Sequence, residues 1–182
     1  MGLTYAGIGS RDTPAEICKT MTELAQRLGK LGYTLYSGSA DGADDAFERG
    51  ASRKMIFLPW DGFNGRWVDN DQYVVPPYVE DMARKFHPAG ERLKAGVLKM
   101  MSRNCYQVLG PDLKSPVDFI ICWTKDGKAT GGTGQAIRIA ESIGIPVFNL
   151  KNQDSIGELG QYIIRRGFCD DPVCSTRLTV GH

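Results

Sequence analysis

The sequence predicts an α/β protein with a Rossmann-like, doubly wound, mainly parallel sheet of about five or more strands. Short apolar runs of strand length alternate with longer segments of helical periodicity, which is typical of parallel strands joined by right-handed crossovers. Three glycine-bearing loops each follow a predicted strand and open a helix. Residues 60–116 interrupt the alternation, and we expect them to form a helical insertion between the third and fourth strands.

The first part of the chain predicts three strands and two helices. Residues 3–8 form an apolar run that ends in glycine, as a buried strand does. Thr13 and Glu16 have capping-box spacing around a proline, and apolar residues at helical intervals follow until Gly29 and Gly32. The remaining elements expected here are a strand at 33–36, a helix at 41–49 and a strand at 55–58.

The second part of the chain begins with the insertion, which opens on a turn-rich loop and continues with two helical segments. Ser155 and Glu158 form a second capping-box pattern that predicts a last helix to about residue 165. We expect one domain over 1–182, with its core at 3–150 and a C-terminal helix and arm at 151–182. The other expected elements are helices at 77–86, 91–109 and 134–143, and strands at 117–123 and 146–150.

Composition restricts the partners that we expect. Lys plus Arg is 22 and Asp plus Glu is 21, whereas nucleic-acid-binding surfaces are usually basic, so we do not expect nucleic acid as a partner. Five scattered cysteines and two histidines argue against a zinc site, and we expect reduced thiols, no metal and no cofactor. No signal peptide and no membrane-spanning run is evident, which predicts a cytoplasmic protein without a membrane partner.

The glycine loops are the candidate binding elements. Glycine lets the backbone approach a ligand, and amide groups at a helix start favour phosphate. Each loop taken alone is also explained as an ordinary turn, and neither the ATPase phosphate loop nor the complete dinucleotide fingerprint is present. With Arg103 of the insertion, the candidate nucleotide-binding residues are Gly7, Gly9, Ser10, Arg11, Gly38, Ser39, Gly42, Gly131, Gly132, Thr133, Gly134 and Gln135.

Other side chains have two interpretations each. Asp41 and Asp44 stand at the second loop, where a carboxylate can hold a ribose hydroxyl or stabilise a sugar cation during glycosidic cleavage, or can simply favour the helix N-terminus. Trp60 and Phe63 can stack on a base or form a small satellite core. Arg103 suits bidentate contact with phosphate, and a structural ion pair explains it equally well.

The three motifs Gly7-Ile8-Gly9-Ser10-Arg11, Ser37-Gly38-Ser39-Ala40-Asp41-Gly42-Ala43-Asp44 and Gly131-Gly132-Thr133-Gly134 resemble the SLOG superfamily. This group includes the DNA-processing protein A family and the LOG phosphoribohydrolases, and the likeness is closest to small SLOG proteins of phages and prophages. The resemblance covers about residues 3–150 and implies a Rossmann-like fold that binds nucleotides or their derivatives. It also implies frequent dimerisation, and host cytoplasm as the location if the chain is phage-encoded.

The chain departs from the LOG pattern P-G-G-x-G-T-x-x-E. Thr130, Gln135 and Arg138 stand where that pattern has proline, threonine and the catalytic glutamate, so the LOG activity does not transfer directly. Glu141, one helical turn further on, is the remaining candidate carboxylate beside Asp41 and Asp44.

Three functions therefore stay open at the level of sequence. The first is an enzyme that cleaves or transfers at the N-glycosidic bond of a nucleoside monophosphate. The second is a non-catalytic sensor or sponge for a nucleotide signal in phage–host conflict, which Arg138 favours. The third is single-stranded DNA binding. The partners that we expect are a nucleotide-like small molecule and a second copy of the chain in a homo-oligomer.

Overall fold

The structure is a computed structural model that describes residues 2–68 and 71–167. The predicted C-terminal arm beyond residue 167, with Cys169 and Cys174, lies outside the described residues.

One six-stranded sheet organises the described chain, and every pairing in it is parallel. The strand order is β4-β3-β2-β1-β5-β6, so the chain builds outward from β1 in one direction and then returns to build from β1 in the other. The order therefore reverses between β1 and β5, as a doubly wound fold requires. The strands are β1 (Thr4–Gly9), β2 (Thr34–Ser37), β3 (Lys54–Phe57), β4 (Tyr73–Val74), β5 (Phe119–Trp123) and β6 (Val147–Asn149).

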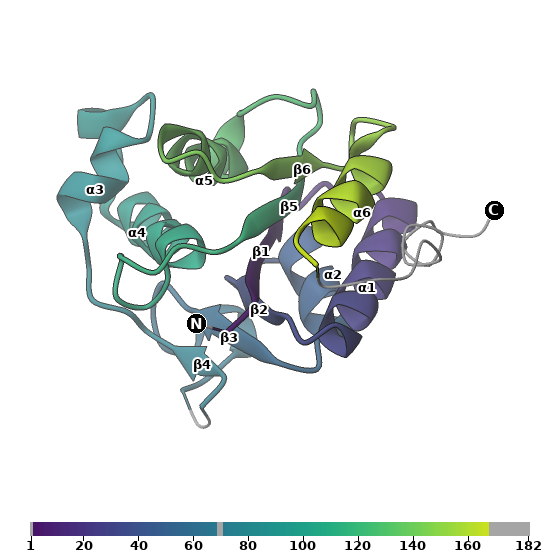
Figure 1. Ribbon diagram of the computed structural model, residues 1–182. Helices are drawn as coiled ribbons and strands as arrows, with labels where there is room; N and C mark the ends of the chain where they lie inside the picture. Colours follow the sequence, from purple (N-terminus) through teal and green to yellow (C-terminus); the bar gives the residue numbers. More distant parts are fainter. Residues whose placement is uncertain (1, 69–70, 168–182) are drawn as a thin grey trace.

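Helices cover both faces of the sheet, which confirms the predicted fold class (Figure 1). Helices α1 (Ala15–Lys30), α2 (Ala43–Gly50) and α6 (Ser155–Arg165) lie on one face. Helices α4 (Ala95–Leu109) and α5 (Gly131–Ser142) lie on the other, with α3 (Glu80–Lys85) packed against α4. Two short 3-10 turns, Phe63–Gly65 and Gly90–Arg92, complete the regular structure. No helix within the described ranges is long and apolar enough to span a bilayer.

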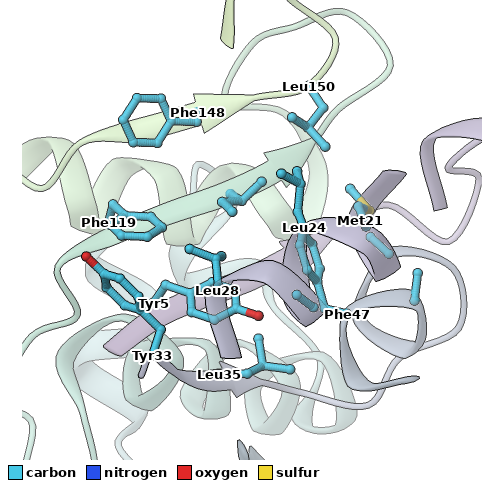
Figure 2. Packing of buried hydrophobic residues seen from close by; sticks show 14 of the residues in the cluster. Tyr5, Met21, Leu24, Leu28, Tyr33, Leu35, Phe47, Phe119, Phe148 and Leu150 are labelled. Carbon is cyan, nitrogen blue, oxygen red and sulfur yellow. The ribbon is translucent and has the colours of Figure 1, made fainter. Parts of the chain in front are cut away.

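The two faces of the sheet have separate cores because successive strand side chains point in opposite directions. Tyr5 and Phe119 point toward α1 and α6, where they meet other aromatic side chains (Figure 2). Ala6 and Ile120, their neighbours in sequence, pack instead beneath α4 and α5. The first core is built from large aromatic and aliphatic residues, whereas small residues are frequent in the second.

The insertion is part of the fold rather than an addition to its surface. Its helix α4 packs against α5 and against β1, β2 and β3, so it supplies half of the second helical layer. It also supplies strand β4, which the sequence analysis missed because only two residues pair within a turn-rich loop. Ile56 N–H donates to Gln72 O (2.6 Å) and Leu58 N–H to Val74 O (2.7 Å), which attaches this strand to β3.

Both predicted capping boxes are wrong. Thr13 does not cap α1, because its hydroxyl donates to Ser10 O (2.6 Å) and the helix begins after Pro14. Ser155 is already inside α6, and its hydroxyl donates to Asn149 O (2.7 Å). In both cases the hydroxyl donates to a carbonyl near the end of the preceding strand and does not accept a hydrogen bond from an N–H in the first turn of the helix.

Candidate functional site

A pocket of about 580 Å³ lies at the carboxyl ends of β1 and β5, where the strand order reverses. Parts of all three glycine loops reach it, and one face of α4 forms its opposite wall. Its volume is in the range of small-molecule sites. The predicted binding residues that line it are Gly9, Ser10, Arg11, Arg103, Gly131, Gly132 and Thr133, together with the predicted catalytic residue Asp44.

The glycines of the first two loops serve close packing of the loops themselves. A Cβ on Gly9 would lie 2.5 Å from the Cβ of Ala43. Gly42 has a positive φ of 81°, and a Cβ there would lie 2.6 Å from Ser10 O. Only glycine allows these two loops to approach so closely. Gly7 is likewise a packing residue, because a Cβ there would lie 2.6 Å from the Phe47 ring.

The third loop, in contrast, is open. A Cβ on Gly131 would meet nothing within 4 Å, and one on Gly132 would meet only the flexible end of Met101 at 3.3 Å. The Thr130 side chain at the N-cap position binds Asp126 and leaves the first turn of α5 uncapped. Since first-turn amides have no intrahelical partner, the N–H groups of residues 131–133 are placed to bind an anion at the pocket.

Asp44 and Arg103 form a buried pair at the base of the pocket, with Oδ2 and Nη2 3.9 Å apart. Asp44 accepts N–H groups from both loops that it joins, Gly9 (3.2 Å) and Ala40 (3.4 Å). Arg103 donates to Gly38 O, and its guanidinium lies 5.3 Å from the centre of the Phe63 ring. A Cβ on Gly38 would overlap that guanidinium, so this glycine makes room for Arg103.

Burial sets the electrostatics of this pair. Burial raises the pKa of Asp44 to about 6, against the lowering effects of Arg103 and of backbone N–H groups. Burial also lowers the pKa of Arg103, and the nearby positive charge of Arg11 lowers it further, whereas Asp44 opposes both. Two exposed cations, Arg11 and Lys125, add positive charge at the pocket. The described lining of the pocket thus contains three cationic side chains, one buried carboxyl at its base and one exposed carboxylate, Asp12.

The polar face of α4 is the part of the site that the sequence analysis missed. Asn104 and Gln107 line the pocket one turn apart and are almost fully buried. Asn104 Nδ2 donates to Gly132 O (3.3 Å), which ties α4 to the third loop. Gln107 Nε2 is buried without a hydrogen-bond partner among the described residues. A buried donor left unsatisfied is costly, so this amide is a candidate contact for a ligand acceptor.

His87 also lines the pocket. Its Nδ1 accepts the N–H of Ala89 (3.1 Å), which leaves Nε2 to carry the proton of the neutral ring. Burial, together with the charge of Arg138, lowers the His87 pKa. The ring is therefore a neutral hydrogen-bond donor at the pocket near pH 7.

Two of the three predicted catalytic carboxylates lie outside this pocket. Asp41 is exposed and accepts a hydrogen bond from Asn64 Nδ2 (2.8 Å), so it holds the insertion loop. Glu141 is exposed near the end of α5, far along the helix from its pocket-facing first turn. Asp44 alone of the three lines the pocket. Within the described ranges there is no group of three metal-ligating side chains.

Several predicted binding residues support the loops rather than line the pocket. The Ser39 hydroxyl donates to Glu48 Oε2 (2.9 Å). Gln135 is buried between Asn104, from which it accepts a hydrogen bond, and Ala83 O, to which it donates. Gly134 allows the close approach of Ala129 to α5. The residues outside the lining are Gly7, Gly38, Ser39, Gly42, Gly134 and Gln135.

Arg138, at the position of the LOG glutamate, is a structural anchor. Its Nε donates to Phe86 O (2.7 Å) and its Nη1 to Ala129 O (2.8 Å). These bonds fasten the end of α3 and the loop before α5 onto the helix, and the side chain does not line the pocket.

No protein-family model and no curated protein sequence matches the chain. A solved structure of DNA processing protein A from Helicobacter pylori, described for its single-stranded DNA binding mode, is similar with a TM-score of 0.53 and 18% sequence identity. The alignment covers 92% of this chain and 74% of that chain.

This similarity corrects one expectation. We did not expect nucleic acid as a partner, and that conclusion is wrong, because a protein with the same fold binds single-stranded DNA. The expectation rested on net charge, which averages over the whole surface and takes no account of the cations gathered at one pocket. The chain has the Rossmann-like fold of DNA processing protein A.

Proposed function

We propose that the chain binds single-stranded nucleic acid by seating one of its nucleotide units in the pocket at the ends of β1 and β5. The observation that carries this proposal is the convergence of open helix-start amides, cationic side chains and a buried unpaired donor on one cavity. The shared fold with a protein described as binding single-stranded DNA supports it.

The phosphate would lie against the first turn of α5. There the amides of Gly131, Gly132 and Thr133 offer donors and the helix dipole favours negative charge. Arg11 and Lys125 supply positive charge from exposed positions in the lining. Such contacts depend on salt, because bound cations displace counterions from the phosphate backbone.

The base or sugar would lie against α4. Val97, Met100 and Met101 give this wall an apolar surface, and Asn104 and Gln107 give it amide groups. Methionine adapts its shape to a flat partner, and the Gln107 amide can donate to a base acceptor. This arrangement favours recognition of a nucleotide over that of a bare anion.

The test is fluorescence anisotropy with a labelled deoxythymidine decamer. Gly132→Val should weaken binding about tenfold or more, because the added side chain obstructs amides that bond a charged group. Outside its own helix, the one described atom within 4 Å of that Cβ position is the end of Met101 at 3.3 Å, so the fold should persist. Gly9→Val is a poor test, since its Cβ would overlap Ala43.

Gly157→Val is the matched control. Gly157 lies in the first turn of another helix, α6, is exposed, and has nothing within 4 Å of its Cβ position. The Gly157→Val variant should bind the decamer with the same affinity as the parent. Equal affinity of Gly132→Val and the parent would refute this location for the phosphate, and no binding by the parent would refute the function.

Competition identifies the form of the ligand. A decamer that binds more tightly than thymidine 5′-monophosphate at equal phosphate concentration supports a single strand as the partner. Equal affinities per nucleotide would instead indicate a mononucleotide ligand, as a sensor or sponge would have.

A second candidate function is cleavage at the N-glycosidic bond, favoured by one observation. Asp44 lines the pocket, and burial raises its pKa to about 6, which suits a carboxyl that exchanges protons near neutral pH. Incubation with nucleoside monophosphates should then release free base, detected by chromatography, and Asp44→Asn should abolish the release. No base from any nucleotide with the parent protein would rule this candidate out.

A further inference from the structure

A second pocket, of about 450 Å³, lies beside the first and shares Arg103 with it. Its walls come from the loop after β3, from the segment around β4 and from α4. The apolar lining residues are Leu58, Pro59, Trp60, Val68, Val75, Pro76 and Tyr78. The polar lining residues are Asp61, Lys99, Ser102 and Arg103.

Exposed apolar side chains gather here to an unusual degree. Trp60, Val68, Val75 and Tyr78 are each between 41% and 49% exposed, and all four line this pocket. The described chain has only two other large apolar side chains with comparable exposure, Trp67 and Ile143. Scattered exposed apolar residues are ordinary, whereas a gathered set marks a binding surface.

The walls of this pocket are held in place before any ligand binds. Trp60 packs edge-on against buried Phe63, with ring centres 5.1 Å apart. Asp61 accepts the N–H of Val68 (2.8 Å), and Ser102 accepts the N–H of Val79 (2.8 Å). A preformed apolar surface loses little conformational entropy when a rigid, flat group binds to it.

The charge at this pocket fits an anionic ligand that carries aromatic groups. Arg103 is nine-tenths buried, and its Nε has no hydrogen-bond partner among the described residues. Lys99 stands exposed at the wall on α4. Asp61, the one carboxylate among the described lining residues, already accepts the N–H of Val68.

We propose that this apolar pocket binds a nucleobase of the same strand whose neighbouring nucleotide occupies the first pocket, with Arg103 between the two. The proposal rests on the proposed function and adds a stacking subsite to it. Aromatic side chains beside cations are how proteins bind single strands without reading their sequence. The strand would then run from α5 across α4 toward β4.

The test compares two decamers of equal charge, one of deoxythymidine and one with abasic sugars throughout. Trp60→Ala should weaken binding of the deoxythymidine decamer about tenfold and leave binding of the abasic decamer unchanged. Trp60→Phe should retain most of the affinity, because a phenyl ring still stacks. Trp67→Ala is the control, since Trp67 is exposed on the same loop and does not line the pocket.

The outcomes separate this subsite from the proposed function. If Trp60→Ala binds the deoxythymidine decamer as tightly as the parent does, the subsite is refuted while the first pocket stands. Equal losses for both decamers, or a change in oligomeric state with unchanged affinity, would also refute it, since neither involves a base. A parent protein that binds neither decamer would refute the function itself. Melting temperatures of all variants confirm that they are folded.

Discussion

The two faces of the sheet differ in what they bury. Under α1, α2 and α6 the buried core is a continuous cluster of aromatic and aliphatic side chains (Figure 2), and the two carboxyl groups that α2 buries, Asp44 and Glu48, both accept hydrogen bonds. Under α4 and α5 the core is smaller, and it borders a group of buried polar side chains. These polar residues are Ser102, Arg103, Asn104, Gln107 and Gln135.

This difference teaches how stability and binding are divided in the molecule. Burial of apolar area stabilises the first face, whereas buried polar groups cost free energy unless each finds a partner. On the second face Asn104 donates to Gln135, which in turn donates to Ala83 O. Gln107 and Arg103, in contrast, retain donors without a partner among the described residues, beside the pockets. A ligand that accepts hydrogen bonds from these donors would offset the free-energy cost of burying them, which explains why this surface is polar.

The largest effect that we expect comes from the aromatic face. Phe119 is fully buried and lies within 6 Å, between ring centres, of Tyr5, Tyr33, Phe148 and Tyr162. Phe119→Ala should lower the free energy of unfolding by about 3–5 kcal/mol, measured by urea denaturation. The folded fraction should bind the decamer with parental affinity, and a large loss of affinity would show that the two faces are not independent.

The second effect concerns Asp44 and pH. Its folded pKa is raised to about 6, above the ordinary value of 3.8, so between these values the folded state holds a proton that the unfolded state has released. The contribution of this group to the free energy of unfolding is therefore fully present below pH 3.8 and is lost as pH rises through about 6. The loss amounts to roughly 3 kcal/mol. Asp44→Asn should remove this decline.

The measurement is the difference in unfolding free energy between Asp44→Asn and the parent at pH 4.5, 6 and 7.5. Taking the difference cancels the titration of all other carboxyls. The unfolding free energy of Asp44→Asn should increase relative to that of the parent as pH rises. A difference that stays constant with pH would mean that Arg103 keeps the carboxyl ionised throughout, as an ordinary ion pair does.

The fold could be predicted from the sequence because its signals are local. Residues 3–8 and 117–123 are apolar runs of strand length, and the structure places β1 and β5 there. The strand at Tyr73–Val74 could not be predicted, because two residues carry no periodicity and their pairing partner is set by the loop. The capping boxes failed because each hydroxyl donates to a backbone carbonyl a few residues earlier in the chain, Ser10 O for Thr13 and Asn149 O for Ser155.

The candidate site could be predicted only in part, for a related reason. Glycine motifs identify Gly9, Gly131 and Gly132 because strand-to-helix loops gather at one sheet edge. Asn104 and Gln107 reach the pocket only because the insertion folds back as α4, which no local pattern shows. A usable signal was present: these amides stand among apolar neighbours in a helix whose positions 101–108 are all buried.

A smaller effect tests whether the polar face is kept for binding. Gln107→Leu replaces a buried amide, whose Nε2 lacks a partner among the described residues, by an apolar group of similar size. Stability should be unchanged or slightly raised, while decamer affinity should fall about fivefold if the lost hydrogen bond was made to the ligand. Unchanged affinity with raised stability would leave the amide without a function.

The smallest effect comes from the matching substitution on the aromatic face. The Tyr5 hydroxyl is buried and has no hydrogen-bond partner among the described residues, and burial raises its pKa. Tyr5→Phe keeps the ring contacts with Phe47 and Phe119 and removes only the unsatisfied group. The protein should become more stable by about 1 kcal/mol, with decamer affinity unchanged. A loss of stability would reveal a hydrogen bond to water in the core, and a loss of affinity would show that the aromatic face also serves binding. Measured beside Gln107→Leu, this variant isolates what the pocket adds, because both remove one unpaired buried donor and only one of them lines the site.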